Sequence, residues 1–181
     1  MILTAADFPG YIETPDTRPE SDHPINAFCS QEAEKGKTGR AVSSGFAPNS
    51  SAPVISEAVL VYANDDDAKA GLDATPALVD CAANVVNAGK LNKSGFELSG
   101  ATSRKIVVDA PGDASYAFEV QANGKTTGPT ATDFNLTITM VFARMGRVSY
   151  HLTISGAGNP LSPEEVAGYA KQAAARIKQQ P

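Results

Sequence analysis

The chain has 181 residues, of which 42% are hydrophobic and 19% charged, so it is long enough to bury one globular core. Its formal net charge is −5 and its Lys and Arg residues form no basic stripe, which argues against a nucleic-acid partner. It contains no run of about 18 apolar residues, so we expect no transmembrane span in this chain.

Turn-forming residues dominate the first third of the chain. Thr4 followed by Asp7 outlines a capping box at a short helix. Many prolines and glycines follow, which predicts an extended segment with at most one short strand, near residues 40–46. We therefore expect a single domain that comprises a turn-rich N-terminal segment, residues 1–53, and a sheet-and-helix core, residues 54–181.

The core begins with a strand and a helix. Residues 55–63 are rich in β-favouring side chains and predict a strand. Asn64 and the acids that follow it are typical of a helix N-terminus. Pro76 either starts a second helix at its first turn or kinks a single one. Gly89 is the expected terminator.

The second half changes to a strand-like period. Residues 134–143 alternate apolar with mostly polar side chains, which predicts one buried face. Turns are expected at residues 112–113 and 123–124, and a terminal amphipathic helix starts near Ser162. The fold class is therefore α+β: an antiparallel sheet of about five or six strands with two main helices packed on it. The strands expected in this half are residues 104–110, 115–122, 134–143 and 148–155.

The chain has two cysteines, Cys29 and Cys81, which are too few for a zinc site but sufficient for one cross-link. A disulfide between them would indicate an oxidising compartment; two buried free thiols would suit the cytoplasm. No signal-peptide pattern precedes Ile2, which at face value indicates the cytoplasm. We favour the disulfide and a leader or anchor removed before Ile2.

Several of these elements occur in an order known from one family. The matching residues are Cys29, the strand at 59–63, the helix at 78–82 and the hairpin at 141–148. On these residues the chain resembles the extracellular sensor domains of mycobacterial receptor-type serine/threonine kinases, the PknH-like family, and related actinobacterial envelope lipoproteins. The resemblance implies an α+β domain with a cleft, an extracytoplasmic location and no catalysis. The Trp that this family commonly has before the second cysteine is absent.

The sequence contains no recognisable catalytic or metal-binding motif. The spacing of His23 and His151 gives no sign of a metal site. The acids at residues 65–67 lack the alternating ligands of a calcium loop and indicate a helix cap. No nucleophile elbow, phosphate-binding loop or zinc-protease helix is present. We therefore expect no cofactor, no metal and no enzymatic activity, with an unrecognised hydrolase as an alternative.

Aromatic residues in the predicted strands are candidates for a ligand cleft. Aromatic side chains on a concave sheet face, with one cation at the rim, can hold an apolar or glycan ligand; the alternative is that most of them are core. We predict a sensor-type or ligand-binding domain of a secreted or lipid-anchored envelope protein, whose ligand is a small molecule, lipid or glycan. The alternative is a protein partner bound without a small-molecule pocket. The candidate residues are Tyr62, Tyr116, Phe118, Arg144 and Tyr150.

Overall fold

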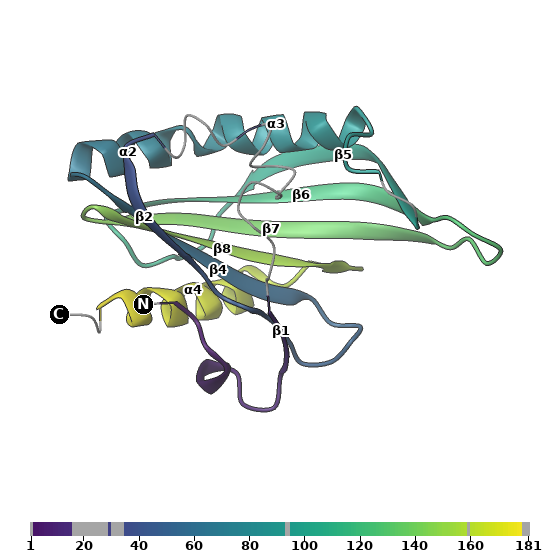
Figure 1. Ribbon diagram of the computed structural model, residues 1–181, viewed down its shortest axis with the longest axis horizontal. Coiled ribbons are helices and arrows are strands. Elements are labelled where there is room, and N and C mark those ends of the chain that lie inside the picture. The colour runs from purple at the N-terminus through teal and green to yellow at the C-terminus, as the bar shows by residue number, and fades with distance from the viewer. Residues whose placement is uncertain (1, 16–28, 30–34, 93–94, 159, 179–181) are drawn as a thin grey trace.

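The architecture is one antiparallel β-sheet with helices on both faces (Figure 1). The computed structural model describes residues 2–15, 29, 35–92, 95–158 and 160–178. The sheet order is β1-β3-β4-β8-β7-β6-β5, and β2 pairs with β4 off this path. The strands are β1 (Ile12–Thr14), β2 (Lys37–Val42), β3 (Gly45–Ala47), β4 (Val54–Tyr62), β5 (Phe96–Ile106), β6 (Ala114–Thr126), β7 (Asp133–Met145) and β8 (Val148–Ala157).

The α+β class is confirmed, but the expected number of strands was too low, because the described residues form an 8-stranded sheet. The segment expected to hold at most one short strand contributes β1, β2 and β3. β1 and β3 have only 3 residues each, which is too short to show an alternating pattern. They form because neighbouring strands offer hydrogen-bond partners, and strand propensity depends strongly on such context.

The helices begin where the local sequence favours it. Pro76 lies in the first turn of a separate helix, so it starts a second helix and does not kink a single one. The Asn64 side chain accepts a hydrogen bond from the Asp67 N–H at 2.8 Å, and the Ser162 and Glu165 side chains each accept the other's backbone N–H. The helices are the 3₁₀ turn η1 (Ala5–Asp7) and the α-helices α2 (Asp65–Asp73), α3 (Thr75–Asn87) and α4 (Pro163–Lys178).

Both faces of the sheet are covered. Helices α2 and α3 lie over one face, and α4 lies with residues 2–11 under the other (Figure 1). In β7, Val141 packs in the cluster with α4 and is 1% exposed, while Phe142 packs in the cluster with α2 and α3 and is 3% exposed. The expectation that this strand buries a single face was therefore wrong, because alternation does not show whether a second layer covers the more polar face.

Strand β6 runs through the pair Asn123-Gly124, which was expected to form a turn. Both residues are paired with β5 on one side and with β7 on the other. The ring of Phe134 occupies the space in which a Cβ of Gly124 would lie. Glycine is therefore required here by close packing of an aromatic ring within the sheet, and not by a turn.

Strand β5 contains a bulge that is held from the helix layer. Its pairing with β6 shifts register between Ser99 and Thr102, and Gly100 has a φ of +61°. The Asn87 side chain of α3 accepts a hydrogen bond from the Ala101 N–H at 2.6 Å and donates one to the Ala101 carbonyl at 2.9 Å. The amide thus replaces the ladder partners that the bulged residue loses.

A disulfide joins Cys29 to Cys81, as expected, and its Cα atoms are 5.7 Å apart. The cysteines are separated by 52 residues, so the bond ties the region before β2 to the middle of α3. Within the described parts of the chain, no helix is long and apolar enough to cross a bilayer.

Candidate functional site

The aromatic residues predicted to line a cleft are largely part of the core. Tyr62 is 1% exposed, Phe118 7% and Tyr150 0%. They belong to separate clusters: Tyr62 packs with Ala68 of α2, Phe118 with residues of α2 and α3, and Tyr150 with residues of α4. The Tyr150 hydroxyl donates a hydrogen bond to the Pro111 carbonyl at 2.9 Å. The structure therefore does not bring these rings together around one hollow.

The two remaining candidates lie nearer the surface. The ring of Tyr116 is half-buried, and the Lys105 ammonium lies 4.9 Å from its centroid. Arg144 forms an ion pair with Asp113 at 3.4 Å and donates to the Gly146 carbonyl at 3.2 Å. These contacts give Arg144 a structural role at the β7–β8 turn. Ligand binding by the aromatic residues and Arg144 stays a prediction.

A different site lies on the sheet face that carries α4. Figure 1 shows α4 beneath one end of this face, while β5, β6 and β7 extend beyond it. A hollow of about 390 Å³ lies on this part of the sheet, and we call it the polar groove. Its lining consists mainly of hydroxyl and amide side chains and glycines. The lining residues are Gly100, Thr102, Gln121, Ala122, Asn123, Asn135, Thr137, Gly158 and Pro160.

Strand register arranges the polar side chains of the groove in rows. Gln121 of β6 pairs with Thr102 on β5 and with Thr137 on β7. In the next row, Asn123 pairs with Asn135 on β7 and with Ser99 on β5. Residues directly opposite one another in a ladder project from the same face. The rows therefore contain uncharged groups that both donate and accept hydrogen bonds. Thr137 is only 7% exposed and its hydroxyl donates to the Gly158 carbonyl at 3.1 Å, whereas Thr102, Gln121 and Asn123 are exposed.

The row nearer to α4 contains a buried charge that is compensated. The Glu119 side chain is 4% exposed, and its Oε1 accepts hydrogen bonds from Arg104 Nε and Gln121 Nε2, each at 2.8 Å. Arg104 Nη2 lies 2.7 Å from the same oxygen. The carboxylate is thus neutralised by an ion pair and also orients the Gln121 amide. This leaves the floor of the groove without an uncompensated charge.

A second hollow, of about 460 Å³, shares Asn123 and Asn135 with the polar groove. Charged side chains join its lining, and Lys125 pairs across the strands with both Glu97 and Asp133. Opposite charges facing each other across neighbouring strands attract, so this end of the sheet is also balanced in charge.

The described residues contain no group of three or more His, Cys, Asp or Glu that could hold a metal ion. His151 lies away from the groove, edge-on to the ring of Phe142 at 4.8 Å between centroids. Burial, and then the charge of Arg40, lower the pKa of His151 to about 4. His23 lies outside the described residues. The hydroxyl and amide side chains of the groove can bind a ligand through hydrogen bonds.

Sequence reasoning missed the polar groove. Its residues form no motif, and each one alone predicts only a solvent-facing position in a strand. The only available signal was the unusual density of Thr, Asn, Gln and Ser on three consecutive strands.

No protein-family model matches the chain, and no curated protein sequence matches it. Among solved structures, it is similar to the extracellular domain of PknH from Mycobacterium tuberculosis. The two share 14% sequence identity with a TM-score of 0.44, and the match covers 94% of this chain and 83% of that one. A similarity of that size does not establish a common function.

Proposed function

We propose that this chain is a non-enzymatic, extracytoplasmic domain of the sensor or ligand-binding type, which binds an uncharged polar ligand of the cell envelope in the polar groove. The observation that carries the proposal is the set of cross-strand rows of hydroxyl and amide side chains, among them Thr102, Gln121 and Thr137, in a hollow of about 390 Å³ that α4 leaves uncovered.

The chemistry of the lining favours an oligosaccharide among the expected ligand classes. Sugar hydroxyls donate and accept hydrogen bonds, and so do the amide and hydroxyl groups of Gln121, Asn123 and Thr137. A lipid chain would require an apolar lining. An anion would require an uncompensated cation, whereas the nearby Arg104 is paired with Glu119.

The disulfide supports the proposed compartment. Disulfides persist in oxidising environments and are rare in cytosolic proteins. The bond between Cys29 and Cys81 accounts for both cysteines of the chain. Two reactive thiols in unfolded protein that was purified without reductant would contradict an extracytoplasmic location.

The ligand proposal can be tested by titrating ¹⁵N-labelled protein with a neutral trimer of N-acetylglucosamine. We expect chemical-shift changes that concentrate on the amides of Thr102, Gln121 and Thr137, and a weaker response in a variant of the exposed Thr102, Thr102→Val. The matched control is Thr153→Val, the same substitution in β8 outside the groove lining. Shift changes that avoid the groove, or equal binding by both variants, would contradict the proposal.

A protein partner is the second candidate, and exposed apolar side chains near one sheet edge favour it. Ile12 of β1 is 50% exposed, and Val42 of β2 and Val54 of β4 are each 37% exposed. β1 is the terminal strand of the sheet order, and no described strand pairs with its outer edge. Capture of an envelope protein that is lost with Ile12→Ser but kept with Thr102→Val would favour this function over glycan binding.

A further inference from the structure

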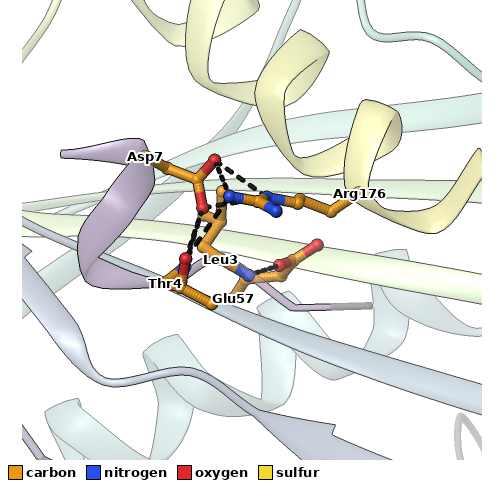
Figure 2. Close-up of polar contacts among 5 residues, drawn as sticks. All are labelled: Leu3, Thr4, Asp7, Glu57 and Arg176. Atoms are coloured by element: carbon orange, nitrogen blue, oxygen red, sulfur yellow. Dashed lines mark hydrogen bonds and ion pairs between the residues drawn. The ribbon is translucent and has the colours of Figure 1, made fainter. Parts of the chain in front are cut away.

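A carboxylate is buried beneath the N-terminal segment. Glu57 lies in the middle of β4 and is 1% exposed. Its Oε2 accepts a hydrogen bond from the Leu3 N–H at 2.7 Å, as Figure 2 shows. Its Oε1 is buried and has no hydrogen-bond partner among the described residues. A carboxylate with one unpartnered oxygen in the core is costly to ionise, and the proposed function does not use it.

The same segment is fastened at a second point. Asp7 forms an ion pair with Arg176 of α4 at 2.7 Å and accepts the Thr4 N–H at 2.9 Å (Figure 2). Burial alone would raise the pKa of Asp7, but its hydrogen bonds with Arg176 and Thr4 outweigh burial and lower it. Residues 2–8, which we call the N-terminal strap, are thus pinned to α4 by an ion pair and to β4 through Glu57.

Apolar contacts complete the attachment of the strap. Leu3 is 1% exposed and Phe8 is 4% exposed, and the Phe8 ring stacks on Phe46 with 4.8 Å between centroids. The strap therefore covers Glu57 and separates it from water. If the strap lifted, the carboxylate would become hydrated.

Burial, more than any neighbouring charge, keeps Glu57 protonated. Burial is the largest cause and raises the pKa of Glu57 to about 7, and the negative charge of Asp7 also raises it. The Leu3 N–H acts in the opposite direction. From β8, Tyr150 faces Glu57 as a neutral phenol, since burial and then the charge of Glu57 raise the pKa of Tyr150. Ser43 contacts only the backbone of Glu57, accepting its N–H at 2.8 Å.

We propose that Glu57 is a proton-controlled latch for the N-terminal strap, which holds the strap against β4 while the carboxyl group is protonated and weakens that hold when the group ionises. The geometry that supports this is a single buried carboxyl, covered by a short segment that is fixed to it through one backbone hydrogen bond.

The direction of the pH effect follows from linkage. With the strap closed the pKa of Glu57 is about 7, and with the strap open it returns toward the ordinary value of 4.5. Between these values the closed form holds one more proton than the open form. Raising the pH across this interval therefore favours opening by up to about tenfold for each pH unit, and no further change follows above the interval.

Hydrogen exchange measured by NMR tests the latch. The readout is the protection factor of the Leu3 amide, corrected for the intrinsic exchange rate, at about pH 5 and about pH 7.5. We expect protection to fall at least about tenfold over this range, while Val120 in β6 keeps its protection. In Glu57→Gln, which cannot ionise, we expect the protection of Leu3 to be independent of pH. Glu13→Gln, the same change at an exposed glutamate of β1, should retain the wild-type pH dependence.

Three outcomes would overturn the proposal. The first is that the protection of Leu3 does not change with pH. The second is that Leu3 loses as much protection in Glu57→Gln as in the wild type. The third is that Val120 loses protection in parallel with Leu3, which would indicate global unfolding. If Glu57→Gln does not fold, the ¹³Cδ signal of Glu57 in the wild-type protein decides. A titration midpoint near the ordinary glutamate value would overturn the latch, and a midpoint near 7 that coincides with the change in Leu3 protection would support it.

Discussion

Two of the polar side chains that this fold buries show how specific partners make burial possible. The Tyr150 hydroxyl has the Pro111 carbonyl, and the carboxylate of Glu119 has Arg104 and Gln121. A buried polar group without a partner costs far more than one hydrogen bond contributes, so each of these partners is part of the reason the side chain can be buried. No residue-level pattern in the sequence identifies such partners. Pro111 is 39 positions from Tyr150, and the two meet only in the folded chain.

The Tyr150 hydrogen bond can be measured by removing only the hydroxyl. We expect Tyr150→Phe to lower the free energy of unfolding by about 1 kcal/mol, because the ring still fills the core but the Pro111 carbonyl loses its donor. Tyr116→Phe is the matched control, since this half-buried ring forms a cation–π contact and no hydrogen bond of its hydroxyl is recorded in the described structure. Urea unfolding followed by circular dichroism provides both values. Equal losses in the two variants would contradict the assigned role of the hydroxyl.

At the scale of elements, the sequence predicts those whose signal is local. The caps at Asn64 and Ser162 fix the starts of α2 and α4, and strand-like periodicity fixes most of β4, β7 and β8. Elements that depend on a neighbour are missed. β1 and β3 are too short to show a period. The middle of β5, residues 99–103, is rich in Ser, Thr and Gly, so its strand state depends on pairing with β6 and on support from α3.

The support from α3 gives a prediction for that element. We expect Asn87→Ala to lower the free energy of unfolding by about 2 kcal/mol, because it leaves both the N–H and the carbonyl of Ala101 unpaired, and Ala101 is only 6% exposed. Asn84→Ala, an exposed position on the same helix, provides the same change in helix propensity and should be close to neutral.

Amide hydrogen exchange localises the effect. Loss of protection should centre on Ala101 and the bulge between Ser99 and Thr102, beside the polar groove. An Asn87→Ala variant that is as stable as Asn84→Ala, with an unchanged bulge, would show that the strand holds this shape without the helix.

At the scale of the whole molecule, layering decides which residues can form a site. Strand aromatics such as Tyr62 and Tyr150 suggested a cleft, but helices or the N-terminal strap cover most of both sheet faces and turn these rings into core. The polar groove exists because α4 stops short of the ends of β5, β6 and β7 (Figure 1). Neither the length of the cover nor the register that aligns Thr102, Gln121 and Thr137 is encoded in a local pattern.

Glu57 and His151 are buried groups with large pKa shifts, and they affect global stability in opposite directions. Burial raises the pKa of Glu57 from 4.5 to about 7, and burial together with Arg40 lowers that of His151 from 6.5 to about 4. Between pH 4.5 and 6.5 the folded state holds a proton on Glu57 and the unfolded state holds one on His151. Each state thus binds one proton on this pair, so the pair contributes almost no pH dependence in that interval.

Removing either group should reveal the pH dependence of the unfolding free energy that the other group contributes. In Glu57→Gln the unfolded state alone takes up a proton, so stability should fall on acidification by up to about 1.4 kcal/mol per pH unit relative to the wild type. In His151→Gln the folded state alone holds the proton, so stability should fall instead as the pH rises. Urea unfolding at several pH values gives the free energy of unfolding against pH for the wild type and both variants, and the exposed Glu97→Gln is the control. The two variants and the wild type share every other titrating group. Opposite changes in the slope of unfolding free energy against pH, relative to the wild type, can therefore come only from this pair. Parallel curves would mean that the fold shifts the pKa of neither group.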